Sequence, residues 1–284
     1  MDTLSIWPAV DLMRPAFFPF FSTLLLLWLS SRFSRSNPWP LTGDLIVLSG
    51  IFLAFFLFDR PSILHLANPS RPMDWIPALA LLSFAFRWLL KRHSPWIPES
   101  LTLVISSLIL LFPLLRRHPS SGSFLLAEII GLWLLVQILP VRSTNSGLAR
   151  PALAPIFLTT ATLGALSPLS GSLLLGQLAG GLSAVWLAML LSPPGRILLR
   201  GAEPGIALGG LLLVGREYVD ISFYVIGALY LALLFGSLTQ RILTVRPALP
   251  APLRALVPSL VSLVFLGLAV AKTLQSSQGA GSGY

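Results

Sequence analysis

Few ionisable residues lie inside the apolar stretches of this sequence, and Glu128 is the clearest of them. It lies between the apolar runs 124–127 and 129–130. A charged group in hydrocarbon is costly, so Glu128 is either a relay for a proton or cation, or an interfacial carboxylate that hydrogen-bonds a neighbouring helix. No second acid or lysine lies close to it in the sequence. This isolation favours the hydrogen-bonded role.

A second polar stretch, 216–220, separates two apolar runs and contains Arg216, Glu217 and Asp220. If the preceding helix ended within the membrane, Arg216 and Glu217 would line a pocket, where a helix terminus and paired charges suit a polar ligand. The alternative is an exposed hairpin loop in which Asp220 caps the next helix. We expect the exposed loop.

A ladder of small residues recurs at intervals of four positions, which places its members on one stripe of a helix. Its members are Ser172, Gly176, Gly180, Ala184 and Ala188. Small side chains let another helix backbone come close, and this packing drives helix association in lipid. We expect the partner to be the span at 151–169, joined to the ladder by a tight turn at 168–171. A second copy or a different protein are the alternatives.

The remaining candidate residues have structural explanations. Asp44 and Asp74 are expected to be helix N-caps, and Arg87, close to the basic run 91–93, is expected to extend towards an interface. Three hydroxyls in the span at 151–169 are expected to hydrogen-bond across helices; these are Thr159, Thr160 and Thr162.

Residues for well-known catalytic centres are missing. The sequence has no cysteine, and its three histidines, His65, His93 and His118, fall in predicted connections. It contains no His-Glu-x-x-His motif, no Gly-x-Ser-x-Gly elbow with a histidine partner, and no cluster of aspartates for magnesium and a diphosphate. We therefore expect no catalytic residues, no cofactor and no metal.

Composition places the chain in the membrane. Its 284 residues are 55% hydrophobic and 10% charged, with a mean hydropathy of +0.84, whereas about 25% charge is usual in soluble domains. A soluble enzyme, a disordered protein and a nucleic-acid binder are thereby excluded. The net charge of +9 comes from arginines scattered between apolar runs, where they act as topology determinants.

Apolar runs bounded by charge or proline predict an all-α, polytopic transmembrane bundle of about ten spans, within a range of 8–10. The expected spans are 15–31, 41–58, 73–90, 97–115, 123–141, 151–169, 171–191, 204–219, 221–238 and 253–271. The span at 204–219 has an apolar centre of only eleven residues, 205–215. It is either a re-entrant half-helix or a thin crossing that continues through the 216–219 stretch.

The spans form one integral membrane domain at 1–271, followed by a tail at 272–284 that we expect to be flexible because it is rich in serine and glycine. Ten spans divide into halves at 1–148 and 149–271. A repeated unit with an odd number of spans gives inverted topology, which is common in transporters. The two halves share no clear sequence similarity.

These observations favour a non-catalytic membrane subunit, structural or accessory, that packs against partner helices. Its expected partners are the lipid bilayer, other membrane subunits or a second copy, and no nucleic acid. A carrier for a small or lipophilic solute is the alternative, and a lipid-modifying enzyme is a weaker one. The expected location is a bacterial cytoplasmic membrane.

Overall fold

A computed structural model describes residues 19–28, 42–59, 74–90, 101–102, 104–106, 108–109, 131, 149–191, 203–245 and 250–281. Every regular element among these residues is a helix, as the sequence predicts. The elements are an apolar helix Pro19–Trp28, α2 Thr42–Asp59, α4 Trp75–Leu89, α7 Ala149–Leu166, the 3-10 turn η3 Pro168–Ser170, α8 Leu173–Leu191, α9 Glu203–Tyr218, α10 Phe223–Val245 and α11 Ala251–Gly281. The expected span at 123–141 lies outside the described residues, apart from residue 131.

Four described segments are long and apolar enough to cross a membrane. They are Leu153–Ser170, Leu173–Leu191, Phe223–Leu243 and Leu256–Gln275, with 18 to 21 residues each. At about 1.5 Å per residue these helices are about 27–32 Å long, which matches a hydrocarbon core of about 30 Å. Their length and composition therefore support membrane integration.

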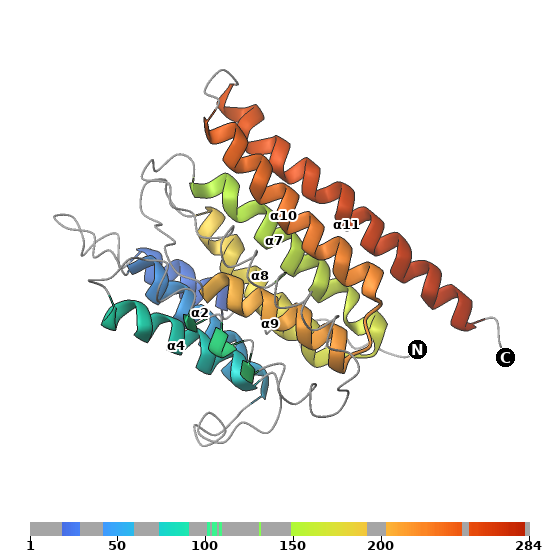
Figure 1. Cartoon of the computed structure of the whole chain (residues 1–284), viewed down its shortest axis with the longest axis horizontal. Coiled ribbons are helices and arrows are strands. Elements are labelled where there is room, and N and C mark those ends of the chain that lie inside the picture. Colours follow the sequence, from blue (N-terminus) through green and yellow to red (C-terminus); the bar gives the residue numbers. More distant parts are fainter. Residues whose placement is uncertain are drawn as a thin grey trace, which may run out of the picture.

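The described residues contain two helical hairpins, α7–α8 and α10–α11, which pack side by side (Figure 1). α7 pairs with α8, and α10 pairs with α11, while α7 also packs against both α10 and α11. α2 packs on α8 and α4, and α9 packs on α4. α11 therefore lies along one edge of the bundle and α4 along the opposite one (Figure 1).

α9 is the most enclosed helix, because every residue from Pro204 to Gly215 is buried. A helix that is apolar on all sides belongs inside a bundle rather than on its surface. Its backbone continues without interruption through Arg216 and Glu217 to Tyr218. The sequence predicts either a half-helix or a continuous helix here. The structure has the continuous helix, which is 16 residues or about 24 Å long.

α11 is the longest described helix, with 31 residues, and it continues past Lys272 to Gly281 (Figure 1). Residues 272–281, where the sequence predicts a flexible tail, are thus helical. No proline follows Pro258, and once a helix exists each added residue gains a backbone hydrogen bond. The hydroxyl of Thr273 also donates to the carbonyl of Ala269 at 3.0 Å.

The charged residues expected at helix ends differ in detail from the sequence prediction. Asp44 is the third residue of α2, inside its first turn rather than before it. Asp74 does occupy the N-cap position of α4, but its side chain makes no capping hydrogen bond. Arg87 lies in the last turn of α4, half-buried beside the exposed Trp88. An interfacial position for Arg87 fits this location.

Candidate functional site

Glycine residues bring the backbones of α7 and α8 into direct contact. A Cβ atom added to Gly164 of α7 would lie 3.1 Å from the backbone nitrogen of Gly180 and 3.3 Å from the carbonyl oxygen of Gly176. A Cβ atom added to Gly176 would lie 3.0 Å from the carbonyl oxygen of Gly164 and 2.9 Å from two ring carbons of Pro168. The small residues thus face the helix that the ladder pattern favoured, and they leave no room for a larger side chain between the helices.

The five ladder residues do not share one role. Ala184 and Ala188 are buried, while a Cβ atom added to Gly180 would meet no described residue within 4 Å. Ser172 is the N-cap of α8, since its Oγ accepts the backbone N–H of Leu175 at 3.2 Å. The sequence pattern gives all five residues the same importance, whereas the structure places the tight contact at Gly176.

A tight turn makes α7 and α8 neighbours, as the sequence suggested. Gly171 has φ 86°, a left-handed conformation that glycine adopts without steric cost. The N–H of Gly171 donates to the carbonyl of Pro168 at 3.1 Å, and the N–H of Ser172 donates to the carbonyl of Ser167 at 3.0 Å. This pair of bonds is a Schellman motif, which ends one helix and redirects the chain.

The polar residues at 216–220 lie at one end of the bundle, but they do not form the loop that we expected. Arg216 and Glu217 are half-buried residues of the last turn of α9. Only Asp220 is an exposed connection residue, and it has φ 55°, which aspartate tolerates better than most residues. The carbonyl of Ser222 accepts the N–H groups of Val225 and Ile226. Ser222 therefore occupies the start of α10, two residues after Asp220.

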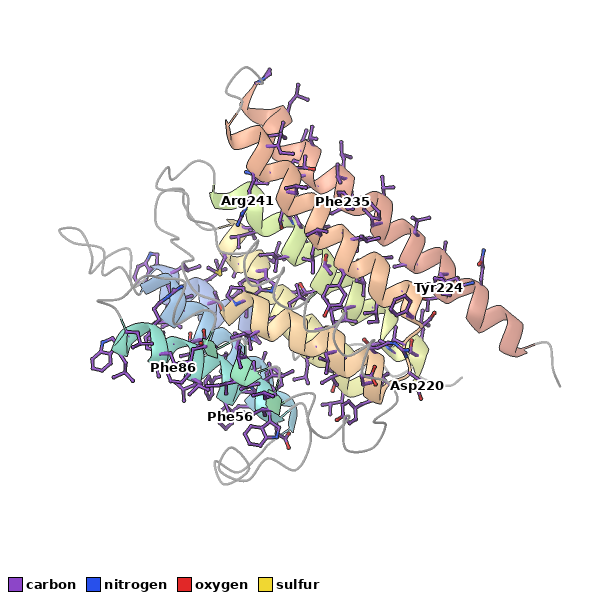
Figure 2. The ribbon with its side chains drawn as sticks, in the orientation of Figure 1. Phe56, Phe86, Asp220, Tyr224, Phe235 and Arg241 are labelled. Atoms are coloured by element: carbon purple, nitrogen blue, oxygen red, sulfur yellow. The ribbon has the colours of Figure 1, made fainter. Side chains whose placement is uncertain are left out.

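An aromatic residue and a cation accompany Asp220 at this end (Figure 2). Tyr224 is 71% exposed, and the Nζ of Lys272 from α11 lies 5.7 Å from the centre of its ring. Amphipathic aromatic rings and lysines are typical of the boundary between lipid and water. Arg241, at the other end of α10, is also exposed (Figure 2). The two ends of α10 thus fit opposite interfaces of a membrane.

The threonine hydroxyls of α7 mostly bond to their own helix. Thr160 Oγ1 donates towards the carbonyls of Ile156 at 2.8 Å and Phe157 at 2.9 Å, and Thr162 Oγ1 donates to Leu158 at 2.9 Å. The expectation that these two hydroxyls join neighbouring helices is therefore wrong. Thr159 is fully buried, and its Oγ1 has no hydrogen-bond partner among the residues that the structure describes.

These neighbouring threonines give a direct test of the packing. Thr159→Val replaces an unsatisfied hydroxyl with a methyl group, so we expect it to raise the free energy of unfolding by about 1 kcal/mol. Thr160→Val removes a satisfied hydroxyl and should lower it or leave it unchanged. Thermal unfolding in mild detergent measures both. A loss of stability in Thr159→Val would mean that its hydroxyl is satisfied in the membrane.

Nothing in the sequence pattern indicates a junction where three helices meet. Ser262 of α11 is fully buried, and its Oγ donates to the carbonyl of Ala232 on α10 at 2.9 Å. A Cβ atom added to Gly236 would collide with that Oγ and would lie 2.9 Å from Cγ of Pro155 on α7. The residues are far apart in the sequence, and each looks ordinary alone. Only their juxtaposition identifies the junction.

Several of the residues that the sequence analysis singled out lie outside the part of the chain that the structure describes. Glu128 and the three histidines, His65, His93 and His118, lie outside the described residues. Within the described residues, no group of three or more histidine, cysteine, aspartate or glutamate side chains could hold a metal ion.

Two comparisons with known proteins found no match. No protein-family model matches the chain, and no curated protein matches its sequence.

Proposed function

We propose that this protein is a non-catalytic membrane subunit, structural or accessory, whose helices pack against each other and against partner helices. The observation that carries the proposal is the close packing of the helices against one another. At the α7–α8 contact, backbone meets backbone at Gly164 and Gly176. Around it, large apolar side chains such as Trp186, Leu163 and Ile51 are fully buried.

The positions of the charged residues support the same role. Arg87 and Arg216 lie in the last turns of their helices, and Asp220 is exposed in the connection between α9 and α10. A carrier or a membrane enzyme commonly holds ionisable groups at the depth where its substrate binds. Those charges instead suit helix ends that meet the membrane surface.

We further infer ten crossings in a bacterial cytoplasmic membrane. The described helices all coincide with expected spans, and α9 is continuous across the bundle. The connection after α8 contains Arg196 and Arg200, and the connection after α10 contains Arg246. Basic connections lie on the cytoplasmic side of a membrane, so these two connections would face the cytoplasm.

Purification from host membranes in a mild detergent tests the proposal. We expect the tagged chain to leave the membrane in an assembly clearly larger than the 30.7 kDa polypeptide. The double variant Arg216→Ala and Glu217→Ala should retain the mass and yield of that assembly, because these side chains have no catalytic task. A lone monomer that transports a solute or modifies a lipid, and that loses the activity in this double variant, would contradict the proposal.

A further inference from the structure

Gly131, within the expected span at 123–141, lies against α10. It is helical, and a Cβ atom added to it would lie 3.5 Å from Cε1 of the Tyr230 ring and 3.8 Å from Cδ1 and Cζ. These distances are ordinary van der Waals contact. Glycine therefore lets the half-buried aromatic ring lie directly against the helix that contains residue 131.

Glu128 precedes Gly131 by three positions. Residues three apart in a helix are neighbours on one face, one turn from each other. Glu128 lies outside the described residues, and its place follows from this spacing. If the whole span at 123–141 is helical, the face that meets Tyr230 at Gly131 also brings Glu128 to α10.

The tyrosine side chain extends towards the same level. In a helix, long side chains lean towards the N-terminus of their own helix. The span at 123–141 is the fifth of the ten inferred crossings and α10 is the ninth, so both run in the same direction through the membrane. The phenol of Tyr230 thus extends towards the turn that contains Glu128, which is about 5 Å along the helix from Gly131.

We propose that the Tyr230 hydroxyl donates a hydrogen bond to the Glu128 carboxylate, and that this bond joins the span at 123–141 to α10. A carboxylate within a membrane is costly unless it is hydrogen-bonded, and a phenol is a strong donor to it. From 226 to 234, α10 contains no polar side chain other than Tyr230. This inference rests on the ten crossings of the proposed function, and it gives Glu128 a structural task.

Cross-linking in native membranes tests the register. The chain has no cysteine, so pairs of introduced cysteines report one contact each. With a short bifunctional thiol reagent, Glu128→Cys should link to Gly227→Cys, one turn before Tyr230 on α10. The matched control is Leu234→Cys, one turn after Tyr230, which should not link to Glu128→Cys. A link to Leu234→Cys alone, or no link to either, would overturn the inference.

A double-mutant cycle tests the hydrogen bond itself. Tyr230→Phe and Glu128→Ala should each raise the unfolding equilibrium constant in mild detergent about tenfold. The double variant should be no less stable than the weaker single variant, because both partners are then absent. Tyr224→Phe, on the same helix and 71% exposed, is the control and should show no coupling to Glu128→Ala.

Additive effects of Tyr230→Phe and Glu128→Ala would overturn the inference and leave the non-catalytic role intact. The proposed function fails in a different way. If the protein transported a solute and Glu128→Gln abolished that transport while Tyr230→Phe did not, Glu128 would act as a relay. That result would contradict both proposals.

Discussion

Replacing Gly236 with alanine is expected to lower the free energy of unfolding by about 2 kcal/mol or more. The added methyl group would collide with the Oγ of Ser262 and lie 2.9 Å and 3.0 Å from Cγ and Cβ of Pro155. The proline ring is rigid, and Ser262 is held by its bond to Ala232. Relief therefore requires α7, α10 or α11 to move. Thermal unfolding in mild detergent measures the loss.

A matched control lies on the same helix. Gly227→Ala introduces the same methyl group nine residues earlier in α10, where it meets nothing within 4 Å. It should leave stability unchanged or raise it by up to about 1 kcal/mol, since alanine is the better helix former. Adding Ser262→Ala to Gly236→Ala should recover part of the loss, because one of the two obstacles is removed. Equal effects of the two alanine variants would contradict the three-helix junction.

Gly176→Ala is expected to separate α7 from α8 and to cost about 2 kcal/mol. Its methyl group would lie 3.0 Å from the carbonyl oxygen of Gly164 and 2.9 Å from the ring of Pro168. Backbone and proline ring are both hard to displace, and the turn at Gly171 fixes the two helices to one another. The same unfolding measurement applies, with helix content checked by circular dichroism.

Gly180→Ala is the control for this contact, one ladder step away on α8. A Cβ atom at Gly180 meets nothing within 4 Å, so we expect a stability equal to that of the unchanged protein or slightly greater. The two glycines are equivalent in the sequence pattern. If both alanine variants were tolerated, the close contact between α7 and α8 would be wrong; if both were equally harmful, the ladder as a whole would matter.

Both glycine contacts support the proposed role, because they hold α7 against its neighbours on two sides. Gly176 fixes α8 to α7, and Gly236 with Ser262 fixes the α10–α11 hairpin to α7. These contacts set the positions of α8, α10 and α11 relative to α7. α11, with its exposed apolar side chains, lies at the edge of the described bundle, where another membrane helix could pack against it.

At the polar stretch 216–220, the sequence pattern did not predict where α9 ends. Arg216 and Glu217 follow an apolar run, and their polarity suggested a loop. The helix nevertheless continues to Tyr218, because arginine and glutamate are good helix formers and the chain turns only at Asp220. Polarity locates the end of the apolar run, but it does not locate the end of the helix.

The sequence by itself determined the helical class, the approximate position of each described helix and the small-residue character of α8, since apolar length and residue spacing are local properties of the chain. It could not separate Gly176 from Gly180 or find the junction of Gly236 with Ser262. Those differences depend on which backbone lies opposite each residue. Only the tertiary structure decides this, because in a membrane almost every surface of a helix is apolar, and contact geometry rather than hydrophobicity selects the neighbours.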